Sequence, residues 1–178
     1  MRRWWPALVP LLLGLCAAGG LLLQGALGRA DPAGVWPDAS TGRTWQDPPA
    51  AGAHRWPQAR AYCESLQLAG HADWRLPTID ELRSLIRGCP ATVAGGGCPA
   101  RHDCKGADCF DDACLGCAMN QGPAQGCYWD EALGGSCDWY WSASSYPGRA
   151  GFAWFVDYPY GFVLMLSHDY EMSVRCVR

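Results

Sequence analysis

Four aspartates in one short stretch carry the clearest chemical potential in this sequence: Asp103, Asp108, Asp111 and Asp112. Carboxylate oxygens are the ligands that Ca²⁺ prefers, so an acidic loop of this kind could hold the ion. The spacing matches no EF-hand, and most acidic loops are simply solvated. The sequence therefore favours a solvated acidic loop. Calcium is the one cofactor it leaves open, and no other cofactor is indicated.

A second pattern, Cys114-x-x-Cys117, has the spacing of a thiol oxidoreductase motif. In an oxidoreductase the motif opens a helix after a strand, which lowers the pKa of the attacking thiol. Here it lies in a glycine-rich loop instead. A structural disulfide role is the favoured interpretation for both cysteines.

Aromatic side chains offer a different kind of site. Tyr158 and Tyr160 flank a predicted turn, where aromatic rings can stack on sugars or anchor a protein partner. Both are therefore candidate ligand contacts, with simple turn packing as the alternative. Trp141 and Trp154 lie inside predicted strands and are expected in the core.

The remaining polar groups indicate structure more than catalysis. Arg75 and Glu81 could be mistaken for a functional pair, but Glu81 is expected to complete a helix cap. The histidines lie in predicted loops without ligand-like spacing, and the serines near residue 144 lack a nucleophile elbow. These residues are His54, His71, His102, His168, Ser142, Ser144 and Ser145. No catalytic residue is assigned, and the chain is predicted not to be an enzyme.

Two helices are predicted ahead of these groups. The first begins at Pro57 and ends before Gly70, because apolar residues recur at helical spacing and point Cys63 into the core. The second begins after Thr78, which forms a capping box with Glu81. Its buried face comprises Leu82, Leu85 and Ile86, and Gly88 ends it.

Strand chemistry dominates the remainder. A first strand is expected within Thr41–Gln46, and an antiparallel meander follows late in the chain. Its predicted strands are Trp139–Ser144, Phe152–Tyr158, Phe162–Leu166 and Met172–Arg178. The fold class is therefore α+β, with two helices packed on an antiparallel sheet.

Ten of the eleven cysteines follow residue 30, an even number that indicates a disulfide framework in an exported chain. Cys176 on the last strand could reach Cys63 on the first helix. The other eight occupy a long insertion, residues 89–137, that shows no periodic structure, and their pairing stays open. They are Cys89, Cys98, Cys104, Cys109, Cys114, Cys117, Cys127 and Cys137.

The first 30 residues predict export. Arg2 and Arg3 precede an apolar run, which is the layout of a signal peptide, cleaved near Ala30, or of an uncleaved anchor. Residues 31–40 are predicted as a linker and 41–178 as one domain, in an extracytoplasmic location. Without the three arginines of residues 1–30, 11 basic and 17 acidic side chains remain, which argues against nucleic acid as a partner. Membrane contact is expected only through residues 1–30, if they are uncleaved.

An ordered series of motifs between about Thr41 and Arg178 resembles one bacterial family. The series comprises Thr41-Gly42-x-x-Trp45-Gln46, Trp56-x-x-Ala59-x-x-Tyr62-Cys63-x-x-Leu66, Asp73-Trp74-Arg75-Leu76-Pro77-Thr78-x-x-Glu81-Leu82, Tyr140-Trp141-Ser142, Ala153-Trp154-Phe155-Val156 and Val174-Arg175-Cys176-Val177-Arg178. The family is the Lcl C-terminal domain, named for the Legionella collagen-like adhesin.

The resemblance implies a fold like that of C-type lectins and formylglycine-generating enzymes, with Cys63 and Cys176 paired. For the named adhesin, it implies attachment to sulfated polysaccharides. This chain differs, since it carries no collagen-like repeat and is net acidic. These differences argue against repeat-driven trimerisation and against polyanion binding.

Together, these patterns predict an exported, non-enzymatic binding or adhesion module for a glycan or protein partner at the cell surface. An enzyme on a formylglycine-generating-enzyme-like scaffold is one alternative. A purely structural envelope protein is the other. The insertion is the first place to look for the binding surface, because loops held on a rigid scaffold commonly supply one.

Overall fold

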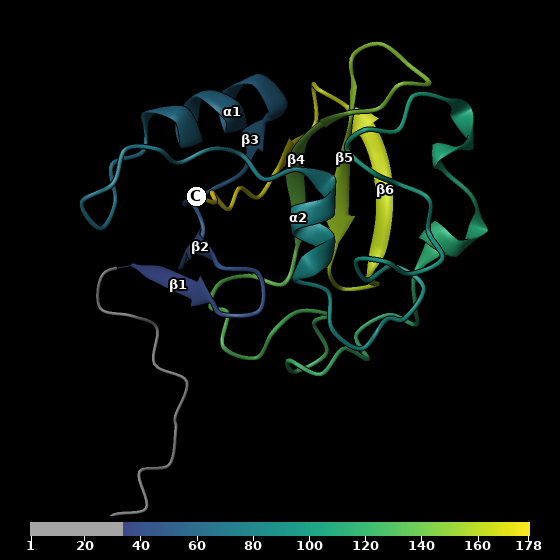
Figure 1. Ribbon diagram of the computed structural model, residues 1–178, viewed down its shortest axis with the longest axis horizontal. Helices are drawn as coiled ribbons and strands as arrows, with labels where there is room; N and C mark the ends of the chain where they lie inside the picture. Colours follow the sequence, from purple (N-terminus) through teal and green to yellow (C-terminus); the bar gives the residue numbers. More distant parts are fainter. Residues whose placement is uncertain (1–33) are drawn as a thin grey trace, which may run out of the picture.

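An antiparallel sheet of three strands forms the centre of the computed structural model, which describes residues 34–178 apart from the side chain of Ala107. Its order is β4 (Trp139–Ser145), β5 (Phe152–Asp157) and β6 (Phe162–Ser167) (Figure 1). Trp141 and Trp154 are fully buried on these strands, so their assignment to the core is confirmed. The first three strands of the predicted meander are confirmed as well.

Two helices pack beside this sheet. Helix α2 (Ile79–Ser84) lies against β4 and β5, and α1 (Trp56–Ser65) lies against β4 (Figure 1). The predicted capping box is present in α2, because Thr78 Oγ1 accepts the Glu81 N–H and Glu81 accepts the Thr78 N–H. Helix α1 is shorter than predicted and ends at Ser65, and Cys63 is fully buried as expected.

A strand lies within the segment that was predicted to be a linker. Strand β1 (Val35–Asp38) pairs with β2 (Arg43–Gln46), and Asp38 closes the turn between them by accepting hydrogen bonds from Ser40 and Thr41. The linker prediction is wrong at Val35–Asp38 because it rested on a composition rich in proline, glycine, alanine and aspartate, which does not show strand pairing. Pro37 is tolerated because β1 has a partner on only one side in this sheet. The domain therefore includes residues 34–40.

The final segment is less regular than the predicted strand Met172–Arg178. Strand β7 (Glu171–Met172) pairs with β3 (His54–Arg55) and then stops. Beyond it, Val177 makes single bridges to Trp45 and to Arg75, so the chain inserts between two segments and forms no continuous ladder.

The insertion contains two short 3₁₀ helices, η1 (Ala107–Cys109) and η2 (Asp112–Leu115), and is otherwise irregular. Four disulfides hold it, and three of them are nested. Cys104–Cys109 lies within Cys98–Cys114, which lies within Cys89–Cys117, and Cys127–Cys137 follows separately. Several of these sulfur atoms belong to the same buried cluster as the apolar face of α2.

The fifth disulfide joins the two ends of the domain. Cys63 on α1 bonds to Cys176 near the C-terminus, and both residues are fully buried in a second core cluster with Trp141 and Phe155. This is the pairing that the family resemblance implies. The described residues thus form an α+β fold in which every cysteine is paired.

Neither helix of the described part is long and apolar enough to cross a membrane. The predicted signal or anchor, residues 1–30, lies outside the described residues.

Replacing Cys63 and Cys176 together by alanine is expected to lower the free energy of unfolding by roughly 4 to 5 kcal/mol, because this bridge closes a loop with a sequence separation of 113. The matched pair Cys104→Ala and Cys109→Ala, with a separation of 5, is expected to cost only roughly 2 kcal/mol. Urea unfolding followed by tryptophan fluorescence measures both. Equal losses of unfolding free energy in the two double variants would contradict the claim that the bridge closing the longer loop stabilises the fold more.

Candidate functional site

Glu81 has the structural role that was predicted, and it also forms an ion pair with Arg75. Arg75 donates two hydrogen bonds of 2.7 Å to the Glu81 carboxylate, and Arg43 donates a third of 2.8 Å. Burial alone would raise the pKa of Glu81. The hydrogen bonds from Arg75, the Thr78 N–H and Arg43 outweigh burial and lower that pKa to about 2. Glu81 therefore ties β2 to the start of α2 and stays ionised at neutral pH.

The four aspartates of the predicted calcium loop do not gather their oxygens into one cluster. Asp111 caps η2 by accepting the Ala113 N–H, and Asp103 pairs with Arg101. Among the described residues, the one set of three possible ligand atoms within 4.8 Å comprises Cys104, Asp108 and Cys109. Since the two sulfur atoms form a disulfide, this set offers a cation a single carboxylate.

Cys114 and Cys117 take part in different bridges. Cys114 bonds to Cys98, and Cys117 bonds to Cys89. The Cys-x-x-Cys spacing thus does not correspond to a redox pair in this structure. It marks the closing ends of two nested loops.

Tyr158 is a core residue, so its prediction as a ligand contact is wrong. It is 1% exposed, its ring contacts those of Trp129 and Tyr140, and its hydroxyl donates to the Leu82 carbonyl of α2. The turn that was expected to expose it folds inward against the insertion. Tyr160 is half-buried and its ring lies 4.6 Å from that of Phe162, which corresponds to turn packing.

The structure brings together one pair that the sequence did not indicate. His102 Nδ1 lies 2.9 Å from Ser144 Oγ, although 42 positions separate the two residues. Ser144 is 1% exposed, and its oxygen also accepts the Ile79 N–H. A nucleophile must be reachable by its substrate, and Ser144 is buried. Its hydrogen bond with the Ile79 N–H instead fixes the start of α2 against β4.

Two of the other three histidines pack against aromatic rings, and the third is exposed. His168 stacks on Trp56 with a centroid distance of 4.1 Å, and His54 packs beside Tyr62. His71 is exposed and lies 4.0 Å from Asp73. None of these histidines belongs to a group of three or more possible metal ligands in the described structure.

A pocket in the second half of the insertion has a volume of about 520 Å³. Its walls include Gln125, Glu131, Gly134 and the Cys127–Cys137 disulfide, and Trp129 lies beneath them. Because a covalent crosslink joins two sides of the opening, the pocket is largely preformed, as ligand sites usually are.

A buried ion pair supports one wall of this pocket. Arg175 and Asp47 are each 1% exposed in their side chains and lie 2.9 Å apart. Asp47 accepts the Gly134 N–H, and Arg175 donates to the Gly134 carbonyl while its guanidinium covers the Trp129 ring at 5.3 Å. The pair thereby fixes the loop at Gly134 from both sides.

The hairpin from Gly122 to Cys127 forms the opposite wall. Gln125 at its tip has a φ of 53°, in the left-handed region that side chains other than glycine rarely adopt. Such strained residues persist where surrounding contacts hold them, and they cluster at binding sites. Gln125 presents an exposed amide at the edge of the pocket.

Glu131 is the one ionisable side chain in the lining of this pocket. The lining of this pocket contains no arginine or lysine, the side chains that commonly bind sulfate and phosphate groups. Its chemistry suits hydroxyl, amide or amine groups, which the Glu131 carboxylate and the Gln125 amide can bind.

The sequence model of the Lcl C-terminal domain matches residues 34–178, the whole described part of the structure. The chain belongs to the Lcl C-terminal domain family. The match begins beside β1, which agrees with the inclusion of residues 34–40 in the domain. Comparison with curated proteins finds no match for this Lcl C-terminal domain protein.

Glu81→Gln is expected to destabilise the protein at neutral pH and to matter little in acid. A carboxyl with a lowered pKa stabilises the fold above its usual pKa of 4.5, and this stabilisation is lost as the pH falls toward 2. The expected difference is about 2 kcal/mol at about pH 6, because the two arginines are partly exposed and screened, and it vanishes near pH 2.

Urea unfolding at the two pH values measures this difference. Glu64→Gln, which alters an exposed pair with Arg60, is the matched control and is expected to have little effect at either pH. A loss of unfolding free energy in Glu81→Gln that stays constant with pH would contradict the lowered pKa of Glu81.

Proposed function

We propose that this protein is an exported, non-enzymatic adhesion module that binds a neutral or amine-bearing glycan in the pocket at Gln125 and Glu131. The observation that carries the proposal is this pocket itself, a preformed opening of about 520 Å³ whose lining holds one negative charge and no positive charge. A protein partner that inserts a side chain of the same chemistry is the alternative occupant.

Family membership supports a binding role, since the family takes its name from an adhesin. We further propose that the fold is C-type-lectin-like, with the Cys63–Cys176 bridge joining the first helix to the end of the chain. The ligand class proposed here differs from a sulfated polysaccharide, because the pocket lacks the arginine and lysine side chains that polyanion binding needs.

The disulfides support the proposed location. Five bridges among the described residues are consistent with an oxidising compartment, and the layout of residues 1–30 favours export to it. The same bridges make a thiol-dependent oxidase the weaker alternative, because all ten cysteines of residues 34–178 are oxidised.

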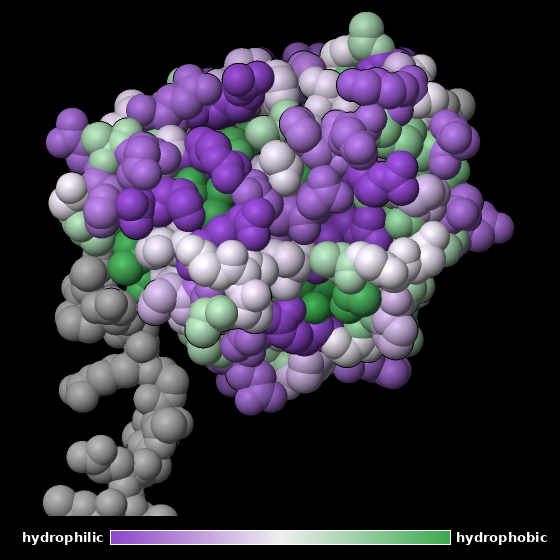
Figure 2. Space-filling model, in the orientation of Figure 1, coloured by the Kyte–Doolittle hydropathy of each residue, from purple (hydrophilic) through white to green (hydrophobic). Residues whose placement is uncertain are grey.

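Surface chemistry also favours a local site over a broad apolar interface. Polar side chains cover most of the face in Figure 2, and its apolar spots are small. The large apolar side chains that are well exposed lie on three segments: Leu115 and Met119 in the insertion, Trp139 on β4 and Tyr170 just before β7. Scattered residues of this kind are normal for a soluble surface.

Binding of the exported full-length protein to an array of immobilised neutral, amino-bearing and sulfated glycans tests the proposal. The unaltered protein is expected to bind members of the first two groups. The double variant Gln125→Gly and Glu131→Ala is expected to lose about tenfold or more in affinity, because it removes the two polar side chains of the pocket. Both side chains are exposed, and glycine relieves the strain at position 125.

The matched control is Gln67→Gly with Glu64→Ala, the same residue types at exposed positions in or just after α1. It is expected to bind like the unaltered protein. Preference for sulfated glycans, or binding that the pocket variant does not weaken, would contradict the proposed site. Failure to bind any glycan would favour the structural envelope role.

A further inference from the structure

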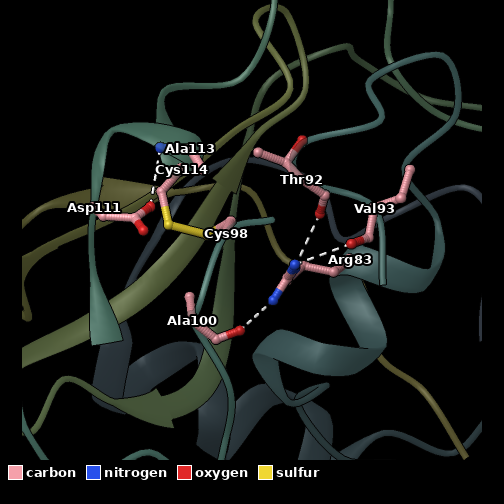
Figure 3. Close-up of a disulfide and its surroundings, with 8 residues drawn as sticks. All are labelled: Arg83, Thr92, Val93, Cys98, Ala100, Asp111, Ala113 and Cys114. Carbon is pink, nitrogen blue, oxygen red and sulfur yellow. Dashed lines mark hydrogen bonds between the residues drawn. A yellow bond between two sulfur atoms is a disulfide. The ribbon is translucent and has the colours of Figure 1, made fainter. Parts of the chain in front are cut away.

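A second buried arginine lies far from the glycan pocket in the sequence and lacks a carboxylate partner. Arg83 on α2 is 3% exposed, and its guanidinium donates to the carbonyls of Thr92, Val93 and Ala100 (Figure 3). These three acceptors lie on both arms of the loop that leads to the Cys98–Cys114 disulfide. All of them are neutral.

The contrast with Arg175 shows what Arg83 lacks. Arg175 is equally buried but lies 2.9 Å from the Asp47 carboxylate. Among the described residues, no carboxylate oxygen lies within the 4.0 Å that would define an ion pair with Arg83. A buried charge without a counter-ion is costly, so buried arginines are normally paired.

Neighbouring charges do not supply the counter-charge that Arg83 lacks. Burial lowers the pKa of the Arg83 guanidinium, the more distant Asp80 partly opposes this effect, and the positive charge of Arg101 adds to it. Arg83 and Arg101 line the same cavity together with Asp80, and Arg101 also lies 3.3 Å from the exposed Asp103 carboxylate. The His102 N–H already occupies one Asp80 oxygen.

A cavity of about 400 Å³ opens at this position, lined by Asp80, Arg83, Arg101 and the loop from Ala94 to Pro99. A guanidinium carries five N–H donors in a fixed fork, and the three carbonyls account for three of them. Two donors of Arg83 therefore remain for a further acceptor.

The wall of this cavity formed by residues 94–99 consists largely of backbone, because three of these residues are glycines. A side chain at Gly96 would bring its Cβ within 2.5 Å of the Pro90 carbonyl oxygen, so this close approach requires glycine. The neighbouring N–H groups of Gly95 and Gly97 make no hydrogen bond within residues 34–178. Free backbone N–H groups beside arginine are the donors that oxyanions bind.

We propose that this cavity is a site for a single small oxyanion group, a carboxylate or phosphate, bound between Arg83 and Arg101. The anion supplies the counter-charge that Arg83 lacks and accepts its two free N–H donors. Asp80 restricts the site to one anionic group, because a polyanion would bring further negative charge against its carboxylate. The site shares no residue with the glycan pocket and does not depend on the proposed function.

Titration of the ¹⁵N-labelled exported protein with acetate and, separately, with inorganic phosphate tests the proposal, at constant ionic strength with chloride as the replaced anion. Saturable shifts are expected for the Gly95 and Gly97 amide signals and the Arg83 side-chain signals, with affinity in about the millimolar range. The arm with the stronger affinity identifies which oxyanion the cavity prefers.

Arg83 itself is left intact, because it holds three carbonyls and its loss would disturb the loop. Arg101→Gln removes the exposed second guanidinium and is expected to weaken binding by about fivefold or more. Ala94→Trp is expected to abolish binding by filling the cavity from an exposed position. Arg55→Gln and Ala51→Trp, at exposed positions outside the cavity lining, are the matched controls and are expected to bind as the unaltered protein does.

Shifts that rise linearly with both anions and never saturate would overturn the proposal. Saturable shifts that are unchanged in both Arg101→Gln and Ala94→Trp would overturn it as well. Melting temperatures of each variant, measured in chloride alone, show that a lost signal reflects the site and not unfolding.

Discussion

Covalent closure of the segment between Cys89 and Cys137 is the constraint on which the other features depend. This segment has two short 3₁₀ helices as its regular structure, so backbone hydrogen bonds alone cannot hold it in one conformation. Three nested bridges close it in steps, each inside the next, and a fourth closes the region around the pocket at Gln125 and Glu131. The buried sulfur atoms also pack with α2 and β5, so the bridges supply core contacts as well as crosslinks.

Two buried arginines stabilise the insertion further, by hydrogen-bonding to its backbone carbonyls. Arg175 acts on the second half of the insertion, where it joins Asp47, Gly134 and the ring of Trp129. Arg83 acts on the first half, where three backbone carbonyls surround its guanidinium. Each arginine satisfies carbonyls that lack strand or helix partners, which is the main cost of burying irregular backbone. The two proposed sites lie beside these two anchors.

Residues with local signals were predicted correctly from the sequence, and residues defined by distant contacts were not. The capping box at Thr78 and Glu81, the burial of Cys63 and the three-stranded meander all follow from patterns within a few positions. Strand β1 was missed because its proline and flanking glycine match a linker composition, and only its pairing with β2 shows otherwise. Tyr158 was misplaced because the turn beside it packs under the insertion. The pairing of the eight loop cysteines and the ion pair of Asp47 with Arg175 span positions that no local pattern connects.

The central claim is that a fixed set of crosslinks shapes the insertion into a preformed binding surface. Peptide mapping of the exported protein by mass spectrometry, without reduction and in acid to prevent exchange, tests this claim most directly. The account predicts the bridges Cys63–Cys176, Cys89–Cys117, Cys98–Cys114, Cys104–Cys109 and Cys127–Cys137, with no free thiol among residues 34–178. A free thiol at Cys127 or Cys137, or a bridge from either one to a nested cysteine, would contradict it.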